Sequence, residues 1–349
     1  MKVLSKINAM RVLLAFSLFW GLTITQASAG PMHTPTKMPM AKAESVGMST
    51  EGLSHIDDVM QEYIDAGTIQ GAVTAVARRG KVVHFSTHGE MDVEKGRAME
   101  PDAIFIMASS AKPVIGVAAM ILIDEGLISP SDPVSKYIPE FANVKVAVLT
   151  EPADADVSPA SKKTKTKTKG KGKGKTLGKG DIPEHRLVPV ETPISIHHLL
   201  THTSGLSASA LGVTVVRAKD DTRATYVPRL AKVPLEFQPG TQWSYGNAGV
   251  TVVSRIIEIV SGRPYEEFVR ERIFKPLEMN NSHFGVPVDE DSKRVVLKGV
   301  DAKKKGSWGI FSAAEDYLHF EQMLLNRGEL FGHRLLSPAS VEMMSSNQV

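Results

Sequence analysis

Ser109 and Lys112 are the residues whose types and spacing first suggest catalysis. They lie three apart near the predicted start of a helix, so their side chains share one face. Pro113 sets that start near Ser109 or Ser110, because proline is tolerated in a helix's first turn, and Gly126 is the expected stop. Backbone N–H groups at a helix start stabilise a developing oxyanion. A neighbouring lysine that loses its proton through burial is a base for the hydroxyl, so the pair predicts a nucleophile with its base.

Structural readings of the same residues stay open at this point. Serine is a favoured helix N-cap and lysine is common on helices, so S-x-x-K alone is weak evidence for catalysis.

The segment W-S-Y-G-N, residues 243–247, precedes a predicted helix that ends at Gly262. There Asn247 fits an N-cap and Tyr245 fits a packing aromatic, although both side chains also suit a polar site.

The composition excludes several classes of site. The 349 residues are 42% hydrophobic, enough to bury a sizeable core, and include no cysteine. Disulfides, thiolate metal sites and a cysteine nucleophile are therefore excluded. Removing three basic residues before position 12 and nine lysines between 162 and 179 turns the formal charge of +3 into about −9. The folded part is acidic, so no specific nucleic-acid partner is expected.

Residues 1–29 have the pattern of a bacterial secretory signal. Lys2, Lys6 and Arg11 precede an apolar run, and A-S-A at 27–29 fits a cleavage site. Residues 30–44 predict a flexible leader. The mature chain is expected to be secreted or periplasmic, with no transmembrane segment after signal removal.

Residues 150–185 form a lysine-rich, low-complexity stretch that predicts a disordered insertion. The alternative is a weak electrostatic contact with a polyanion. The G-K-T at 174–176 is not a P-loop, because lysine replaces the required glycine at 169.

The rest of the chain predicts alternating helices and strands. We expect a helix from Ser49 or Thr50 to Gly67, strands at 71–78 and 81–88, a capping box at 312–315 opening a helix to Asn326, and a last helix after Ser337. His198 and His202 have the spacing of a helical zinc site, but no third ligand is evident and a turn closed by Gly205 is favoured.

Taken together, these segments resemble the penicillin-recognising serine hydrolases. Within them, the chain is most similar to the branch of class C β-lactamases, D-alanyl-D-alanine carboxypeptidases and β-lactamase-like esterases. The matching pieces run from about residue 44 to 349, outside the lysine-rich insertion. They include F-I-M-A-S-S-A-K-P (105–113), L-L-T-H-T-S-G-L (199–206), P-G-T-Q-W-S-Y-G-N-A-G (239–249), I-F-K-P-L-E-M (273–279) and S-W-G-I-F-S-A-A-E-D-Y (307–317).

The resemblance implies a two-lobed β-lactamase/penicillin-binding-protein-like fold, α/β plus all-α, over residues 45–349. It implies Ser109 as the acylated nucleophile and Lys112 as the group that holds its proton. Tyr245 would act with Lys112 as general base, Asn247 would bind the substrate, and the backbone N–H of Ser109 would be one oxyanion donor. No cofactor or metal is expected.

One family motif, K-T-G or H-x-G on a strand beside the site, cannot be placed. Lys304-Lys305-Gly306 fits K-x-G but is expected to lead into a helix. We therefore expect a chain truncated at its C-terminus, without the last strands of the sheet.

Three functions remain open from the sequence. The first is a secreted serine hydrolase that cleaves ester or amide bonds through an acyl-enzyme, with a small ester, amide or peptide as substrate. The second is a non-catalytic module that binds cell-wall peptide. The third is an inactive fragment that lacks the third motif.

Overall fold

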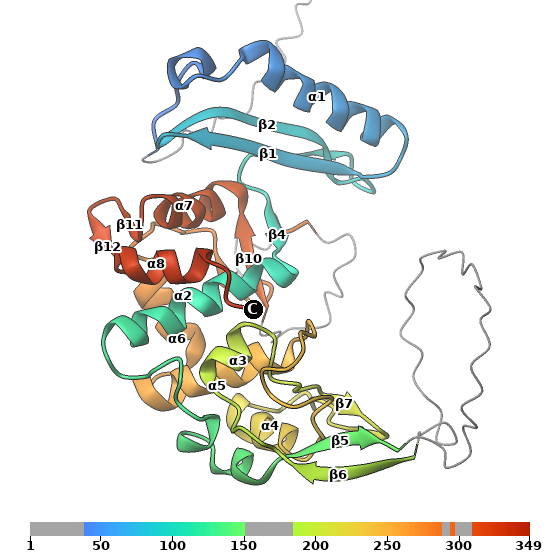
Figure 1. The fold of residues 1–349 in the computed structure, drawn as a ribbon. Helices are drawn as coiled ribbons and strands as arrows, with labels where there is room; N and C mark the ends of the chain where they lie inside the picture. The colour runs from blue at the N-terminus through green and yellow to red at the C-terminus, as the bar shows by residue number, and fades with distance from the viewer. Residues whose placement is uncertain (1–37, 151–183, 288–293, 297–308) are drawn as a thin grey trace, which may run out of the picture. The chain divides into compact units, whose positions relative to one another are not determined.

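A helix packed on a small antiparallel sheet opens the part of the chain that can be described. The computed structural model describes residues 38–150, 184–287, 294–296 and 309–349. Helix α1 (Thr50–Asp65) contacts β1 (Gly71–Arg78) and β2 (Lys81–Asp92), and β3 (Arg97–Ala98) completes a sheet of order β1-β2-β3 (Figure 1). The predicted helix and hairpin are thus confirmed.

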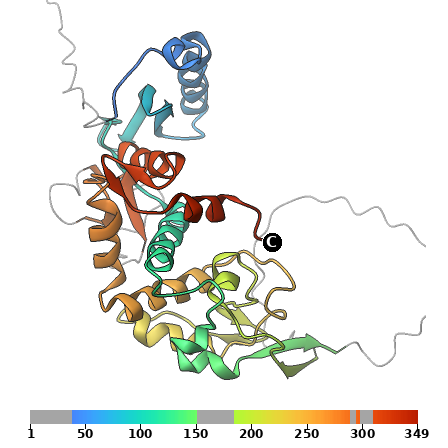
Figure 2. The ribbon, with the colours of Figure 1, turned by 60° about the vertical axis from the view of Figure 1, so that its left-hand side comes forward.

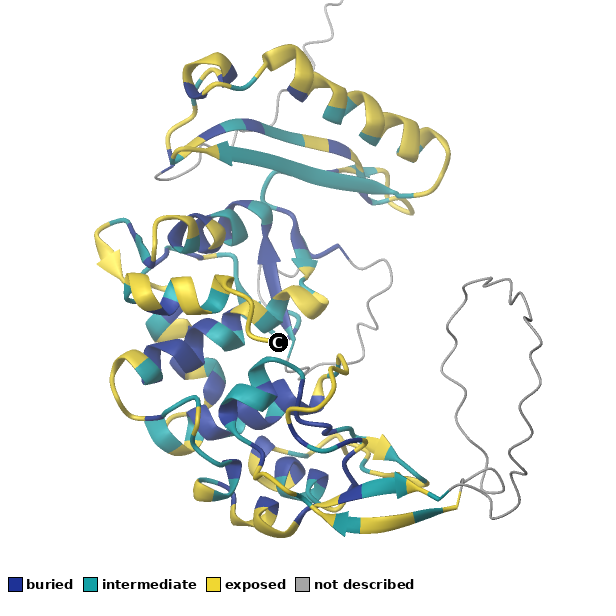
Figure 3. Cartoon of the chain, in the orientation of Figure 1, coloured by how far each residue is buried: buried dark blue, intermediate teal, exposed yellow. Residues whose placement is uncertain are grey.

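Local chemistry explains these boundaries. The Ser49 side chain accepts a hydrogen bond from the backbone N–H of Gly52, as an N-cap should. Arg79 and Gly80 both have positive φ, as a two-residue turn matched to the twist of a hairpin requires. Most of α1 is exposed, so it is held by one narrow face (Figure 3).

The sequence predicts a flexible leader over residues 30–44, but the described part of this segment packs on the first sheet. The backbone of Ala41 donates to Val82, and Val82 donates to Pro39, so this segment lies along β2. A short 3₁₀ turn, η1 (Ala43–Val46), follows, and Glu44 accepts hydrogen bonds from Thr50 at the start of α1. Residues 38–44 therefore belong to the folded unit.

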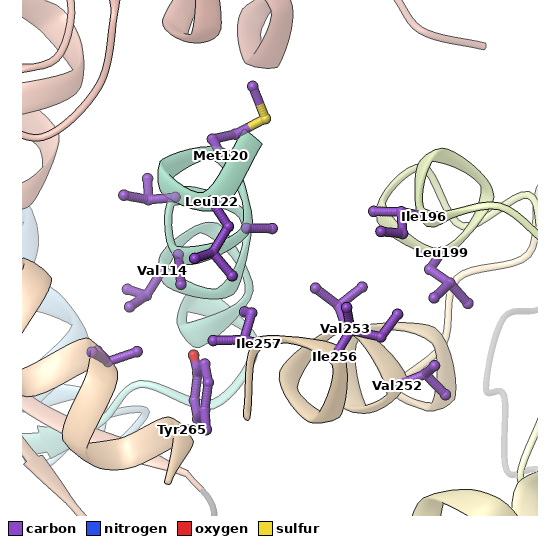
Figure 4. Packing of buried hydrophobic residues seen from close by; sticks show 14 of the residues in the cluster. Val114, Met120, Leu122, Ile196, Leu199, Val252, Val253, Ile256, Ile257 and Tyr265 are labelled. Atoms are coloured by element: carbon purple, nitrogen blue, oxygen red, sulfur yellow. The ribbon is translucent and has the colours of Figure 1, made fainter. Parts of the chain in front are cut away.

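Helix α2 (Ala111–Asp124) is strongly apolar, and half of its residues are buried in the main core. It contacts α5 (Ala248–Ser261), α6 (Tyr265–Val269) and α8 (Pro338–Ser345), an arrangement visible from two directions (Figures 1 and 2). Val114 and Leu122 of α2 and Ile256 and Ile257 of α5 are nearly inaccessible to solvent (Figure 4). Burial of these branched side chains fixes the start of α2 relative to the segment before α5.

Shorter helices complete this core. They are α3 (Ile196–Leu200), α4 (Arg223–Leu230), a π-helical turn η5 (Arg270–Phe274) and the 3₁₀ turns η3 (Val134–Lys136) and η4 (Pro139–Asn143). The predicted last helix is confirmed as α8, whose N-cap Ser337 accepts from the backbone of Ser340.

A second three-stranded sheet lies before α7 (Ala314–Leu325). Strand β10 (Ile310–Ala313) pairs with β4 (Ile104–Ile106) and with β9 (His283–Phe284). The predicted capping box at Ser312 is therefore wrong: Ser312 lies in the strand, and α7 begins without a side-chain cap. The expectation that residues 304–306 lead into a helix is also wrong, because β10 comes first. Lys304-Lys305-Gly306 themselves lie outside the described residues.

The lysine-rich stretch is flanked by a hairpin. Strands β5 (Lys145–Leu149) and β6 (His185–Pro189) pair in antiparallel register. Thr150 donates to Glu184, so the two ends of the predicted insertion meet. Residues 151–183, and with them the predicted disorder, lie outside the described residues. The remaining strands form two small hairpins: β7 (Ser209–Ala210), β8 (Val213–Thr214), β11 (Glu329–Leu330) and β12 (His333–Arg334).

The predicted signal and most of the predicted leader fall within residues 1–37, which lie outside the described residues. Among the helices that are described, none has both the length and the apolar character needed to cross a membrane.

Asp316 is a buried carboxyl in the first turn of α7. It accepts hydrogen bonds from the backbone of Asn281 and from the hydroxyl of Ser282, tying α7 to the segment before β9. Burial raises the pKa of Asp316 from its ordinary 3.8 to about 6, against the opposing effect of these hydrogen bonds.

We expect Asp316→Asn to change how stability depends on pH. Between about pH 4 and 6 the native carboxyl binds a proton that the unfolded chain has released, so this group's contribution to stability falls as pH rises. The loss over that window is on the order of 3 kcal/mol. The difference in unfolding free energy between wild type and Asp316→Asn, measured with urea from pH 4 to 7, should show this slope. A difference in unfolding free energy that does not vary with pH would contradict this expectation. Asp58→Asn, on the exposed face of α1, serves as the control.

Candidate active site

Ser109 lies on a tight turn between β4 and α2. The turn is a 3₁₀ segment, η2 (Ala108–Ser110), so the helix proper begins two residues after Ser109. Ala108 has a φ of 46°, a left-handed conformation that is uncommon for residues other than glycine. Such local strain is typical of functional turns, and here it accompanies an exposed Ser109.

Two contacts from the segment at 310–317 hold this turn. The backbone N–H of Met107 donates to the carbonyl of Ile310 in β10 at 2.9 Å. The Tyr317 hydroxyl on α7 donates to the carbonyl of Ser110, also at 2.9 Å. Ser110 is the N-cap residue of α2, and its side chain makes no capping hydrogen bond.

Lys112 occupies the first turn of α2 and faces Ser109. Its Nζ donates to the Ser109 Oγ over 3.3 Å. The side chain is half-buried, so Lys112 is less shielded from solvent than the buried lysine that the sequence predicts. The same Nζ lies 4.6 Å from the centre of the Tyr245 ring. One ammonium group therefore contacts both other members of the predicted set.

Tyr245 lies on the loop before α5, with 52% of its surface exposed. Hydrogen bonding from Lys112 and Ser109, together with the Lys112 charge, lowers the pKa of its phenol below 10.0. A lowered pKa favours the phenolate, which is the form that accepts a proton. Its exposure argues against the packing role that the sequence left open.

Asn247 occupies the N-cap position of α5, but its side chain makes no capping hydrogen bond. It is exposed, and it is not among the residues that line the cavity described below. The structure thus brings Ser109, Lys112 and Tyr245 together, while the substrate-binding role of Asn247 stays a prediction.

His202 is a site residue that the sequence reasoning set aside as part of a turn. Its ring centre lies 4.9 Å from that of Tyr245 and 6.3 Å from that of Trp243. Burial and the nearby Lys112 charge lower the pKa of His202, which favours a neutral imidazole. The backbone carbonyl of His202 also accepts from Ser244 at 2.9 Å, so this residue braces the Tyr245 loop. His202 also has a left-handed φ of 60°, which the sequence T-H-T-S-G does not reveal.

The predicted turn around Gly205 is confirmed. Gly205 has a φ of 69°, and a side chain there would press against the backbone of Phe237. His198 accepts from the backbone N–H of Ser195 and so completes the cap of α3. The zinc reading of His198 and His202 gains no support, since no described metal-type cluster contains them.

A cavity of about 470 Å³ opens beside the three residues. Its walls are mainly apolar and come from α2, α3, α5 and α8. Lys112 is the only lysine or arginine among the described residues that line it. The lining comprises Ser109, Lys112, Pro113, Gly116, Met120, Ile123, Pro130, His197, Leu200, Thr201, His202, Tyr245, Val250, Met343, Met344 and Gln348.

Comparison with known proteins identifies the family. The sequence model of the Beta-lactamase family matches residues 56–349. The chain belongs to the beta-lactamase family. Protein Rv1367c of Mycobacterium tuberculosis is 30% identical over 314 residues, which cover 83% of this chain and 71% of the relative.

Two further comparisons bear on activity and fold. The lovastatin esterase of Penicillium rubens is 31% identical over 289 residues, covering 80% of this chain and 64% of the esterase. The structure of EstCE1, described as a hydrolase with promiscuous acyltransferase activity, superposes with a TM-score of 0.64 at 23% identity, covering 85% of this chain and 77% of EstCE1. The predicted beta-lactamase/penicillin-binding-protein-like fold is confirmed, and the family includes esterases and other hydrolases.

We expect Lys112→Met to raise the pKa of Tyr245 toward 10.0. The substitution removes the charge and the hydrogen bond that lower it, while keeping an unbranched side chain. The pKa is read from phenolate absorbance in a pH titration, after subtracting the titration of the matching variant that also carries Tyr245→Phe. A Tyr245 pKa that stays the same or falls in Lys112→Met would contradict this electrostatic coupling.

Proposed function

We propose that this protein is a serine hydrolase that cleaves small, largely apolar esters through an acyl-enzyme on Ser109. The observation that carries the proposal is the single Lys112 ammonium in contact with both the Ser109 hydroxyl and the Tyr245 ring, beside an apolar cavity. The esterases among its relatives support the reaction class.

Acylation begins when the Ser109 Oγ attacks the ester carbonyl. Tyr245, held toward its phenolate form by Lys112, takes the hydroxyl proton. The carbonyl oxygen becomes an oxyanion, which the backbone N–H of Ser109 stabilises. Tyr245 then returns the proton to the departing alkoxide, leaving an alcohol and an acylated Ser109.

Deacylation reverses the roles with water. Tyr245 takes a proton from the water that attacks the acyl carbonyl, and the proton passes to the Ser109 Oγ as the acid leaves. The net reaction adds one water across the ester bond. Neutral His202 packs beside Tyr245 with its ring tilted and does not compete for the Tyr245 proton, which suits a positioning role.

The cavity favours neutral esters over carboxylate-bearing substrates. β-Lactams and D-alanyl peptides carry a carboxylate that needs a cationic partner. Among the described lining residues Lys112 is the only lysine or arginine, and it already contacts Ser109 and Tyr245. Apolar walls instead suit an aliphatic acyl or alcohol group.

We also propose that the chain is exported, since residues 1–29 have the pattern of a secretory signal. In that compartment the lysine-rich stretch offers a weak contact to a polyanion.

Ser109→Ala should abolish labelling by a fluorescent fluorophosphonate, because the probe reacts with an activated serine hydroxyl. Ser110→Ala is the matched control, since its side chain makes no capping hydrogen bond. Labelling is read on a gel after heat-denatured blanks are subtracted. Persistent labelling of Ser109→Ala would remove Ser109 from the mechanism. Loss of labelling in Ser110→Ala alone would do the same.

We expect kcat/KM for p-nitrophenyl butyrate to exceed that for nitrocefin, a chromogenic β-lactam, by at least about 10²-fold. Tyr245→Phe should lower the ester rate by about 10²–10⁴-fold, the usual contribution of a general base. The rates with p-nitrophenyl butyrate and with nitrocefin are measured on the same wild-type protein at pH 7.5. Faster hydrolysis of nitrocefin would reject the ester preference, and binding of wall peptide without any turnover would favour a non-catalytic module.

A further inference from the structure

Asp57, His84 and His88 lie close together between α1 and the first sheet, and none of them belongs to the Ser109 site. His84 and His88 are four apart on β2, so they project from the same face of the strand. In the antiparallel register they lie opposite Val76 and Ala72, and Thr74 lies between those two positions on β1. Helix α1, which carries Asp57, runs along this sheet (Figure 1).

The ligand-type atoms of this group converge on one point. The Thr74 Oγ1 is 2.8 Å from the Nε2 of His84 and 3.0 Å from the Nε2 of His88. The Asp57 Oδ1 is 3.9 Å from the first nitrogen and 3.5 Å from the second. The two nitrogens and the carboxylate oxygen all lie within 4.8 Å of one another.

Burial makes this arrangement unusual. Each imidazole side chain is only 7% exposed, whereas the Asp57 side chain as a whole is 45% exposed. The Asp57 Oδ1 is shielded from solvent and has no hydrogen-bond partner within the described residues. A shielded carboxylate oxygen is unfavourable unless a donor or a cation compensates it.

The Thr74 hydroxyl satisfies only part of the group. It has one proton, so it donates to one imidazole nitrogen and must accept from the other. Neither bond supplies a donor to the Asp57 Oδ1. A cation at the point of convergence would bind the lone pairs of both nitrogens and that oxygen together.

We propose that Asp57, His84 and His88 bind one zinc ion, with the Thr74 hydroxyl or a water as the fourth ligand. Imidazole nitrogen and carboxylate oxygen are common zinc ligands, and the metal distances of about 2.0–2.2 Å place tetrahedral ligand atoms about 3.3–3.5 Å apart. The 3.5 Å between Asp57 and His88 already fits, and the 3.9 Å to His84 needs a shift of a few tenths of an ångström. If Thr74 is the fourth ligand, its hydroxyl must also move outward from its 2.8 and 3.0 Å contacts with the two nitrogens.

The ion would have a structural role. It joins α1 to β2 at a place where α1 is otherwise mostly exposed (Figure 3). Because the unfolded chain does not hold these residues together, zinc binding stabilises the folded state. The site shares no residue with the proposed catalytic set, so zinc is not expected to enter the ester reaction.

The test uses the full chain without a polyhistidine tag, stripped with a chelator and titrated with zinc chloride by calorimetry. We expect about one zinc per chain and a higher thermal midpoint with zinc than with chelator. Asp57→Asn, His84→Gln and His88→Gln should each weaken zinc binding by at least about 10–100-fold. Asp58→Asn and His55→Gln, on exposed positions of the same helix, are matched controls that should bind as the wild type does.

Cobalt gives a second readout that misfolding of a variant cannot imitate. Replacing zinc with Co²⁺ should produce visible d–d absorption in the wild type and in the two control variants, but not in folded Asp57→Asn, with folding checked by circular dichroism. Zinc affinity that is equal in wild type and the His84→Gln/His88→Gln double variant would overturn the proposal. So would the absence of zinc binding to the wild type, which would leave a metal-free Asp–His–Thr hydrogen-bonding group.

Discussion

The proposed chemistry depends on one ammonium group. Lys112 lies in the first turn of α2, donates to the Ser109 hydroxyl and lies over the Tyr245 ring. Lys112 acts on both aromatic neighbours. Its hydrogen bond, together with that of Ser109 and with its charge, lowers the pKa of the Tyr245 phenol and so favours the base. Burial lowers the pKa of His202, and the Lys112 charge adds to this effect, which favours a neutral imidazole.

The fold holds that group by packing elements that are distant in sequence. Helix α2 lies against α5, so the start of α2 and the loop before α5 are fixed together. Strand β10 and Tyr317 of α7 hold the turn that presents Ser109. Asp316 ties the start of α7 to the segment before β9, so a buried carboxyl that does not line the cavity supports the same turn. The site thus draws its rigidity from the core rather than from local propensity.

Local sequence patterns predicted several of the helices and strands, and they failed where tertiary contacts determine the structure. The α1 helix, the first hairpin and α8 follow from caps, turn residues and apolar spacing, and the family was evident from its motifs. The S-x-x-E pattern at Ser312 suggested a helix cap, but pairing with β4 places Ser312 in a strand. His84 and His88 show strand spacing in the sequence, yet only the packing of α1 brings Asp57 to them. Likewise, nothing in a lone T-H-T-S-G reveals that the His202 ring packs against that of Tyr245.

In the proposed mechanism Ser109 carries a covalent acyl group during turnover. Acid quenching in the first turnover with p-nitrophenyl butyrate, followed by intact mass and peptide mass spectrometry, would capture that group. We predict one butyryl group per chain, located on the peptide that contains Ser109, with a burst of nitrophenol of matching amplitude. Ester hydrolysis with no adduct and no burst, or with the adduct on another residue, would contradict it.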